Sequence, residues 1–304
     1  MAPARCGFEP SSGLFYETLG YRRADAPPLV FIHGAGATGA CWRCTPDGRA
    51  GWGDLLARRG HECWLADWPG TGRSGGRTAE EITYDDLVDG FQALLREIVG
   101  RPSIVICHSM GGAIAWQLVA RMPELVVGVI SIAGAYPGNL TSRSRVISSN
   151  DGVMEIEFAD TGVRFVVDER RPYLYEDAYV REQAIATSTR FREQDVPRLR
   201  STFVGIPPRV LLQRLGVVSG MPVVAEPAGF RGMRIRLLAG PEDPAHTREI
   251  DTRTVEQLRA WGADATLTWL ADLGIDGNGH FLFYEENSDE VLAVVERLIG
   301  EVAA

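Results

Sequence analysis

Hydrophobic and polar positions along the chain form two alternating kinds of segment. Six short apolar runs have the length and composition of buried strands: Pro28–His33, Cys63–Asp67, Ser103–Cys107, Val127–Ala133, Ile235–Ala239 and Ala265–Leu270. Helical spacing of apolar residues occurs between and after them, at Gly53–Arg59, Tyr84–Ile98, Gly112–Arg121, Arg248–Trp261 and Ser288–Ile299. Strands that alternate with helices predict an α/β fold, with a mostly parallel, doubly wound sheet covered on both faces.

A long stretch, residues 136–230, interrupts this alternation between two of the predicted strands. Its patterns predict a β-hairpin followed by two helices, at Val153–Phe158, Val163–Asp168, Glu176–Arg192 and Pro208–Leu215. Asp160-Thr161-Gly162 supplies the hairpin turn. Because the stretch is too long for a loop, we predict a core domain of residues 1–135 and 231–304. Residues 136–230 form an inserted cap domain over the carboxyl edge of the sheet in this prediction.

Charge and composition narrow the classes of partner. The 304 residues have a net charge of −9, which argues against nucleic acid or an anionic membrane surface as the main partner. No stretch approaches the roughly 18 uncharged apolar residues of a membrane helix, and the N-terminal region lacks the apolar core of a signal peptide. We therefore expect a cytoplasmic protein that acts on a small-molecule substrate. The sequence leaves the oligomeric state open.

The cysteines predict neither a disulfide framework nor a metal centre. There are five of them, Cys6, Cys41, Cys44, Cys63 and Cys107, which is an odd and sparse set for a chain of this length. Cys41 and Cys44 form a C-x-x-C motif, but a zinc site needs a second pair of ligands and none is evident. We expect these two cysteines to pack on the first turn of a helix, while a local disulfide between them stays open.

The stretch Val105–Trp116 begins as an apolar run, crosses a histidine and a serine, and continues in a helical pattern after two glycines. A serine between a buried strand and a helix has the setting of a nucleophile elbow, the sharp turn that displays a catalytic hydroxyl. Such a turn crowds its neighbours, so small residues are needed two positions before and after the serine. Gly111 satisfies the downstream side, whereas Cys107 stands where glycine is more usual. A packing turn explains Gly111 and Gly112 but not Ser109, which we predict to be the nucleophile.

A serine hydroxyl needs a base to take its proton, and that base is normally a histidine held by an acid. Among the five histidines, His280 follows the last predicted strand and therefore lies at the same sheet edge as Ser109. His108 is adjacent to the serine and cannot point at its hydroxyl from the elbow. His61 precedes a strand, at the opposite edge, and His246 lies in a polar loop, where we expect a surface residue. His280 is the predicted base.

The acid is expected at the end of a strand as well. After Ile235–Ala239 the chain continues Gly240-Pro241-Glu242-Asp243-Pro244. Asp243 is the predicted acid and Glu242 is the alternative, while two solvated acids in a turn remain a third interpretation. The order serine, aspartate, histidine along the chain matches the order expected for this fold class.

The developing oxyanion of an acyl transfer needs hydrogen-bond donors. In an elbow the backbone N–H after the serine, here that of Met110, is one donor. The loop His33-Gly34-Ala35-Gly36-Ala37 has the small residues that let a second N–H approach, and Ala35 is the expected donor. We expect His33 to order this loop by hydrogen bonds. A nucleotide-binding turn is disfavoured, because the spacing is not G-x-G-x-x-G.

These motifs together resemble the α/β-hydrolase superfamily. They are His33-Gly34-Ala35-Gly36, Asp67–Ser74, the elbow Cys107–Gly112, Gly240–Asp243 and Gly279-His280-Phe281, in the right order over nearly the whole chain. The resemblance implies an α/β-hydrolase fold with a serine nucleophile. The dehalogenase and epoxide hydrolase branches of this fold have an aspartate at that position.

Two further stretches, Thr45–Arg49 with Gly51-Trp52 and Gly274–His280, are similar to segments of a group of bacterial serine esterases. In some of those esterases the acid is a glutamate after the strand that follows the elbow helix. Here that strand ends Ser131-Ile132-Ala133-Gly134 without an acid, so the role falls on Asp243 or Glu242.

The resemblance implies hydrolysis of a carboxylic ester or lactone through an acyl-enzyme, with no metal or organic cofactor. Carbon–carbon bond hydrolysis, thioester cleavage or cyclisation in a biosynthetic or catabolic pathway uses the same triad and stays as the alternative. A non-catalytic ligand-binding protein that keeps the fold and the pocket is the third hypothesis, because fold alone does not determine function.

The insertion, residues 136–230, gives little information on the substrate. Five of its aromatic residues are expected to form core between cap and body rather than a pocket: Tyr173, Tyr175, Tyr179, Phe191 and Phe203. Arg190 and Arg192 could meet a carboxylate, but as arginines on a predicted cap helix they are expected to be solvated.

Overall fold

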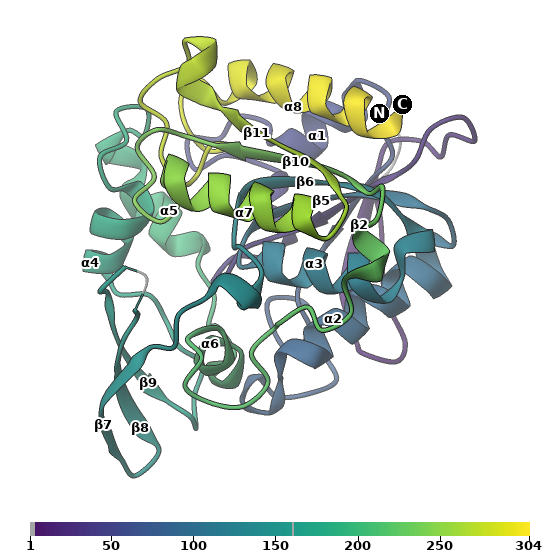
Figure 1. Cartoon of the computed structure of the whole chain (residues 1–304). Helices are drawn as coiled ribbons and strands as arrows, with labels where there is room; N and C mark the ends of the chain where they lie inside the picture. The colour runs from purple at the N-terminus through teal and green to yellow at the C-terminus, as the bar shows by residue number, and fades with distance from the viewer. Residues whose placement is uncertain (1–3, 160) are drawn as a thin grey trace.

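A computed structural model describes residues 4–159 and 161–304 (Figure 1). Eight strands form one twisted sheet in the order β1-β2-β4-β3-β5-β6-β10-β11. Their bounds are β1 Arg5–Phe8, β2 Phe15–Leu19, β3 Leu29–Ile32, β4 Cys63–Ala66, β5 Ser103–Ser109, β6 Val126–Gly134, β10 Arg234–Ala239 and β11 Asp264–Trp269. The neighbouring strands from β4 through β11 all pair in parallel. At the other edge β1 pairs antiparallel with β2, and β2 pairs antiparallel with β4. The predicted parallel sheet is confirmed.

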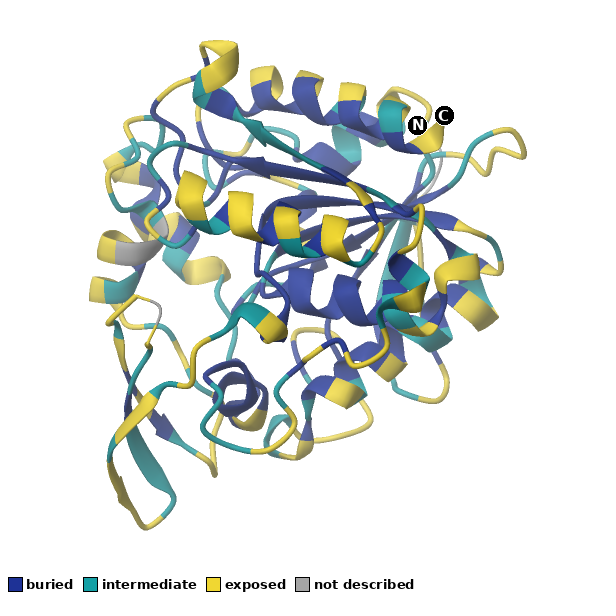
Figure 2. Cartoon of the chain, in the orientation of Figure 1, coloured by how far each residue is buried: buried dark blue, intermediate teal, exposed yellow. Residues whose placement is uncertain are grey.

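Five helices cover the two faces of this sheet: α1 Trp52–Arg58, α2 Tyr84–Ala93, α3 Gly111–Arg121, α7 Arg248–Ala260 and α8 Ser288–Ala303. Helices α2, α3 and α7 share one hydrophobic cluster, and α1 and α8 share the other. Each helix turns its buried residues toward the sheet and its exposed residues outward (Figure 2). This is the amphipathic pattern that the sequence periodicity predicts.

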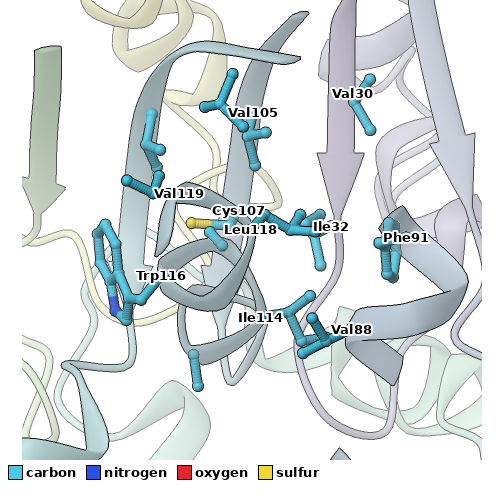
Figure 3. Packing of buried hydrophobic residues seen from close by; sticks show 14 of the residues in the cluster. Val30, Ile32, Val88, Phe91, Val105, Cys107, Ile114, Trp116, Leu118 and Val119 are labelled. Carbon is cyan, nitrogen blue, oxygen red and sulfur yellow. The ribbon is translucent and has the colours of Figure 1, made fainter. Parts of the chain in front are cut away.

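The central strand β5 is buried on both faces, and its alternate residues supply both clusters. Val105 and Cys107 join the cluster beneath α3, while Ile104 and Ile106 join the one beneath α8. Figure 3 shows Val105 and Cys107 packed beside Trp116 and other residues of α3. A strand with two buried faces appears in sequence as a continuous apolar run rather than an alternation, as Ser103–Cys107 does.

The sequence analysis did not predict the strands β1 and β2. Strand β1 has only four residues, three of them exposed, so it has no apolar run to mark it. It pairs with β2, which in turn pairs antiparallel with β4. The pairing of β2 with β4 joins segments distant in sequence, because β3 and α1 lie between them.

The insertion forms a second, three-stranded antiparallel sheet of β7 Arg145–Asn150, β8 Val153–Glu157 and β9 Arg164–Asp168. The predicted hairpin corresponds to β8 and β9, and the predicted turn residue Asp160 lies outside the described residues. Strand β7 was not predicted, because five of its six residues are exposed and show no alternation. Ile156, Phe165 and Val167 of the hairpin pack against α6.

Three short helices complete the insertion: α4 Asp177–Tyr179, α5 Val196–Thr202 and α6 Pro208–Arg214. The prediction of one helix over Glu176–Arg192 is wrong in its extent. Helix α4 continues as a π-helical turn only to Ile185, where Ala186 has a φ of +50°. Beyond it, the backbone N–H of Thr189 bonds the carbonyl of Gly277 in the core instead of a helical partner.

All five cysteines have free thiols. Cys41 is buried in a 3-10 turn, Gly39–Trp42, and Cys44 is exposed just after it. The disulfide that the sequence left open is therefore not formed, and the expected packing of both cysteines holds only for Cys41. None of the helices in the described residues has the length and apolar composition that crossing a lipid bilayer requires.

Candidate active site

Ser109 ends β5 and stands two residues before α3, with a φ of +48°. A positive φ is strained for a residue with a side chain, and such strain persists only where the surroundings enforce it. Here Gly111 and Gly112 enforce it by close packing. An added Cβ would lie 2.7 Å from the carbonyl oxygen of His33 at Gly111, and 2.7 Å from that of Ala135 at Gly112. Larger residues would push the turn apart.

Cys107 occupies the position where glycine was expected, and its side chain is fully buried in the sheet. Its sulfur lies 3.8 Å from the carbonyl oxygen of Ile130 on the neighbouring strand. Burial raises the pKa of the thiol to about 12, which keeps it neutral and inert. Cys107 is therefore a packing residue.

Ser109, His280 and Asp243 lie in one hydrogen-bonded line. His280 Nε2 is 3.0 Å from Ser109 Oγ, and His280 Nδ1 is 2.6 Å from Asp243 Oδ2. Glu242, the alternative acid, instead accepts a hydrogen bond of 2.7 Å from Thr187 at the surface. The structure thus brings Asp243, and not Glu242, to His280.

Two loops meet to make this contact. An added Cβ at Gly240, just after β10, would lie 2.3 Å from the carbonyl oxygen of Asn278, and that oxygen accepts the N–H of Glu242 at 2.9 Å. The close approach brings the acid-bearing loop and the histidine-bearing loop together.

Asp243 is charged in this setting. Burial by itself raises the pKa of a carboxyl, but the charge and hydrogen bond of His280, the charge of His246 and the N–H of Ala245 outweigh it. Together they lower the pKa of Asp243 to about 2. A buried carboxylate of this kind fixes the orientation of the imidazole and stabilises its protonated form.

Gly34, Ala35 and Met110 line the same cavity as Ser109. His33, at the start of this loop, is buried and stacks on Trp68 with 4.9 Å between ring centres. Its Nε2 accepts the N–H of Trp68 at 3.0 Å, so its Nδ1 has the proton and donates to the carbonyl of Gly34 at 2.8 Å. Burial lowers the pKa of His33 to about 4. The neutral ring orders the loop, as predicted.

His108 is buried, and its Nε2 lies 3.1 Å from the carbonyl oxygen of His280. Burial and the neighbouring charge of His280 hold the pKa of His108 well below its usual value. The neutral ring therefore donates to the backbone of the histidine loop and does not bond Ser109.

His246 is buried, although the sequence predicted a surface residue. Only 4% of it is exposed, and its ring stacks on His280 with 5.7 Å between centres. Its Nδ1 lies 3.0 Å from Asp251 on α7. Burial would lower the pKa of His246, but the charge and hydrogen bond of Asp251 raise it overall. Within this loop His246 is buried, although Pro244 and Thr247 are exposed, because its ring contacts both His280 and Asp251 of α7.

Sequence reasoning missed Glu285, a buried acid behind the histidine loop. Its carboxylate accepts the N–H of Gly279 at 2.7 Å, the hydroxyl of Ser188 at 2.5 Å and the amide of Asn278 at 2.6 Å. Burial raises the pKa of Glu285, and these hydrogen bonds offset part of that effect. An acid directly after the apolar run Phe281–Tyr284 was the signal in the sequence.

Three aromatic residues of the insertion that were expected to be core line the cavity instead. Tyr175, Tyr179 and Phe203 line the cavity, with the first two rings stacked at 4.3 Å, rather than serving only as core. Tyr173 instead packs against Phe165 of β9. Phe191 packs against the cluster beneath α8, as expected for core.

Arg190 and Arg192 were expected to be solvated, and both in fact make specific bonds. The Nε of Arg190 donates to the carbonyl of Asp276 at 2.8 Å, and Arg192 pairs with Asp47 and Asp195. Both arginines therefore tie the insertion together or to the core.

Asp243, His246 and His280 also offer three ligand atoms within 4.8 Å of one another. In each histidine, however, Nδ1 already bonds a carboxylate, Asp243 for His280 and Asp251 for His246. His280 also bonds Ser109 Oγ through Nε2, so both of its ring nitrogens are engaged, as in a histidine that transfers a proton between a serine and an acid-held ring.

A serine on a strained strand-to-helix turn, bonded to a histidine and a buried aspartate at the carboxyl edge of a parallel sheet, defines a class of protein, the α/β hydrolases. Comparison with known families agrees, since the model of the alpha/beta hydrolase family matches residues 29–294. The chain belongs to that family.

The chain is similar to several known proteins. A fungal protein described as a probable secreted lipase, phiG of Fungal sp. (strain ATCC 74256), is 25% identical over 330 residues, covering 88% of this chain and 80% of the lipase. Further curated relatives match over shorter stretches, and the chain spans about half of their length or less.

Solved structures share the fold. The haloalkane dehalogenase DbeA from Bradyrhizobium elkani is 19% identical with a TM-score of 0.64, covering 99% of this chain and 98% of that one. A bacterial esterase is 16% identical with a TM-score of 0.56, covering 96% of this chain and 86% of that one. At this level of identity the likeness concerns the fold alone.

Proposed function

We propose that the protein is a serine hydrolase that cleaves a carboxylic ester or lactone. The main observation behind the proposal is the unbroken hydrogen-bonded line from Ser109 through His280 to buried Asp243, which opens onto one cavity. The similarity to a lipase points to the same chemistry. The haloalkane dehalogenase has the same fold, but an aspartate replaces the serine in that branch.

The proposed reaction has two acyl-transfer steps. Ser109 Oγ attacks the carbonyl carbon while its proton passes to His280 Nε2, and the charged Asp243 stabilises the imidazolium. The backbone N–H groups of Met110 and Ala35 are the proposed donors to the oxyanion. His280 then protonates the leaving alkoxide as the carbon–oxygen bond breaks. A water, deprotonated by His280, releases the acyl group by the same route.

We also propose that residues 136–230 act as a cap on the core formed by residues 1–135 and 231–304. The support is that Tyr175, Tyr179 and Phe203 of the insertion line one cavity with Ser109 and His280 of the core. Substrate selectivity then depends on the insertion. Thioester cleavage, carbon–carbon hydrolysis and cyclisation remain alternatives on the same residues.

The cytoplasm remains the proposed location. All five cysteines have free thiols, as is usual in a reducing compartment. The similarity to a probable secreted lipase favours secretion instead. Fractionation of cells that express the full chain distinguishes the two.

Labelling with a fluorophosphonate tests the proposed nucleophile. We expect one adduct by intact mass, mapped to the peptide that contains Ser109, together with turnover in a panel of esters and lactones. Ser109→Ala abolishes both. Ser131→Ala is the matched control, because Ser131 is a buried serine on β6 that does not line the cavity, and it keeps both. Folded wild-type protein with neither adduct nor turnover would contradict the proposal.

A further inference from the structure

Arg214, at the end of α6, is a buried cation in the wall of the cavity that contains Ser109. Only 8% of the residue is exposed. Its guanidinium lies over the rings of Tyr136 and Phe158, at 4.8 Å and 5.4 Å from their centres. Its Nη1 donates to the hydroxyl of Thr141 at 2.8 Å. The cation is therefore held in place by neutral groups.

No carboxylate in the described residues lies within ion-pair distance of this guanidinium. The buried carboxylates of Asp243 and Asp251 are engaged by histidines, Asp243 by His280 and Asp251 by His246. Arg236 is the other buried arginine in the described chain, and it forms ion pairs with both Asp264 and Glu301. Arg214 thus differs from Arg236 in having no counter-charge among the residues that the structure describes.

An arginine stays protonated in a protein, so Arg214 keeps its positive charge although it is buried. A buried charge without a partner is unfavourable, and aromatic faces with one hydroxyl compensate only in part. A guanidinium also has five N–H donors. Donors and charge thus remain available on the wall of a cavity where substrate is expected, which is the arrangement that binds an anion.

We propose that the substrate has a carboxylate group that pairs with Arg214. This inference rests on the proposed ester or lactone hydrolysis and names its substrate class, an ester or lactone with a free carboxylate. A carboxylate fits better than a phosphate, because one planar fork matches one carboxylate, whereas a doubly charged phosphate calls for further donors. Phe158, Leu211 and Leu215 beside Arg214 line the same cavity and favour an apolar spacer between carboxylate and ester.

Two matched pairs of esters test the inference on each side of the scissile bond. The first is 4-nitrophenyl hydrogen adipate against methyl 4-nitrophenyl adipate, with the charge on the acyl side. The second is 4-(butanoyloxy)benzoate against its methyl ester, with the charge on the leaving group. We expect wild-type kcat/KM to favour the charged member of at least one pair by about tenfold or more.

Substitutions at Arg214 connect that preference to the residue. Arg214→Gln reduces the charged-to-neutral ratio of kcat/KM by about 10- to 100-fold, and Arg214→Lys keeps part of it because the charge remains without the fork. Arg209→Gln, an exposed arginine on the same helix, leaves the ratio unchanged. A ratio from one sample does not depend on how much protein is folded, and fluorophosphonate titration counts the active sites.

The outcomes separate the two proposals. If Ser109 is labelled and neutral esters turn over, but no charged ester is preferred or Arg214→Gln leaves the preference intact, only the carboxylate inference is overturned. If Ser109 is not labelled and no ester turns over, the proposed function fails and the inference fails with it.

Discussion

At the scale of single residues, the acid of the triad is decided by where a side chain points. Asp243 and Glu242 are adjacent, and both follow β10, yet Asp243 is 3% exposed and bonded to His280 while Glu242 bonds Thr187. Glu242 lies in the turn that follows β10, and this turn directs the carboxylate of Asp243 toward the imidazole and that of Glu242 toward Thr187. The low pKa of Asp243 keeps that residue charged.

Substitution of each acid tests this assignment. Asp243→Asn keeps the shape but removes the charge that stabilises the imidazolium, so we expect kcat/KM to fall by about 10³- to 10⁴-fold. Glu242→Gln changes a half-buried side chain that bonds Thr187 and not His280, and leaves kcat/KM within about twofold. Steady-state kinetics on an ester that the wild type hydrolyses gives both values. The reverse pattern would assign the acid to Glu242.

At the scale of elements, the elbow depends on glycine where α3 meets the sheet. Helix α3 begins so close to the end of β3 that a Cβ at Gly111 would lie 2.7 Å from the backbone oxygens of Ile32 and His33. Backbone atoms at the centre of a sheet cannot move aside without breaking the pairing between β3 and β5. The glycine is therefore needed for space, while the strain itself is at Ser109.

Gly111→Ala tests this packing. We expect a loss of about 1–3 kcal/mol in the free energy of unfolding, measured by chemical denaturation. Gly300→Ala in α8 is the matched control, because nothing lies within 4 Å of the added Cβ. Alanine is the better helix former there, so a gain of about 0.5–1 kcal/mol is expected. Equal effects of the two substitutions would show that the close approach has no influence on stability.

At the scale of the whole molecule, the insertion is bound to the loop that presents His280. The hydroxyl of Ser188 donates to Glu285 and lies 3.1 Å from the carbonyl oxygen of Gly277, which accepts the N–H of Thr189 at 3.0 Å. Glu285 in turn accepts the N–H of Gly279, next to His280. One buried carboxylate thus joins the two parts of the molecule behind the site.

The raised pKa of Glu285 makes its contribution to the free energy of unfolding depend on pH, with a sign that can be worked out. An acid with a raised pKa in the folded state stabilises the fold below its unfolded pKa, about 4.3, and loses that contribution as the pH rises through its folded pKa. The free energy of unfolding of wild type minus that of Glu285→Gln is therefore largest near pH 4 and falls toward pH 8. Denaturant titrations of both proteins across this range measure it. A constant difference would mean that Glu285 titrates alike in both states.

A feature can be predicted from the sequence when the residues that determine it lie close together along the chain. The buried strands, the elbow at Ser109 and the placement of His280 at the carboxyl edge follow from apolar runs, glycines and chain order, which act over a few residues. Strands β1 and β7 escaped notice because they are short or exposed and have no local pattern. The long helix predicted over Glu176–Arg192 ends early because Thr189 bonds Gly277 instead.

The sequence by itself therefore determined the α/β architecture, the family and a short set of residues for the site. Only the tertiary structure decided which acid meets His280, that His246 is buried, and that Arg214 lies in the cavity without a counter-charge among the described residues. Each of these depends on contacts between segments far apart along the chain. Periodicity records which face of an element is apolar, but not which element covers it, and burial changes the charge and the role of a polar residue.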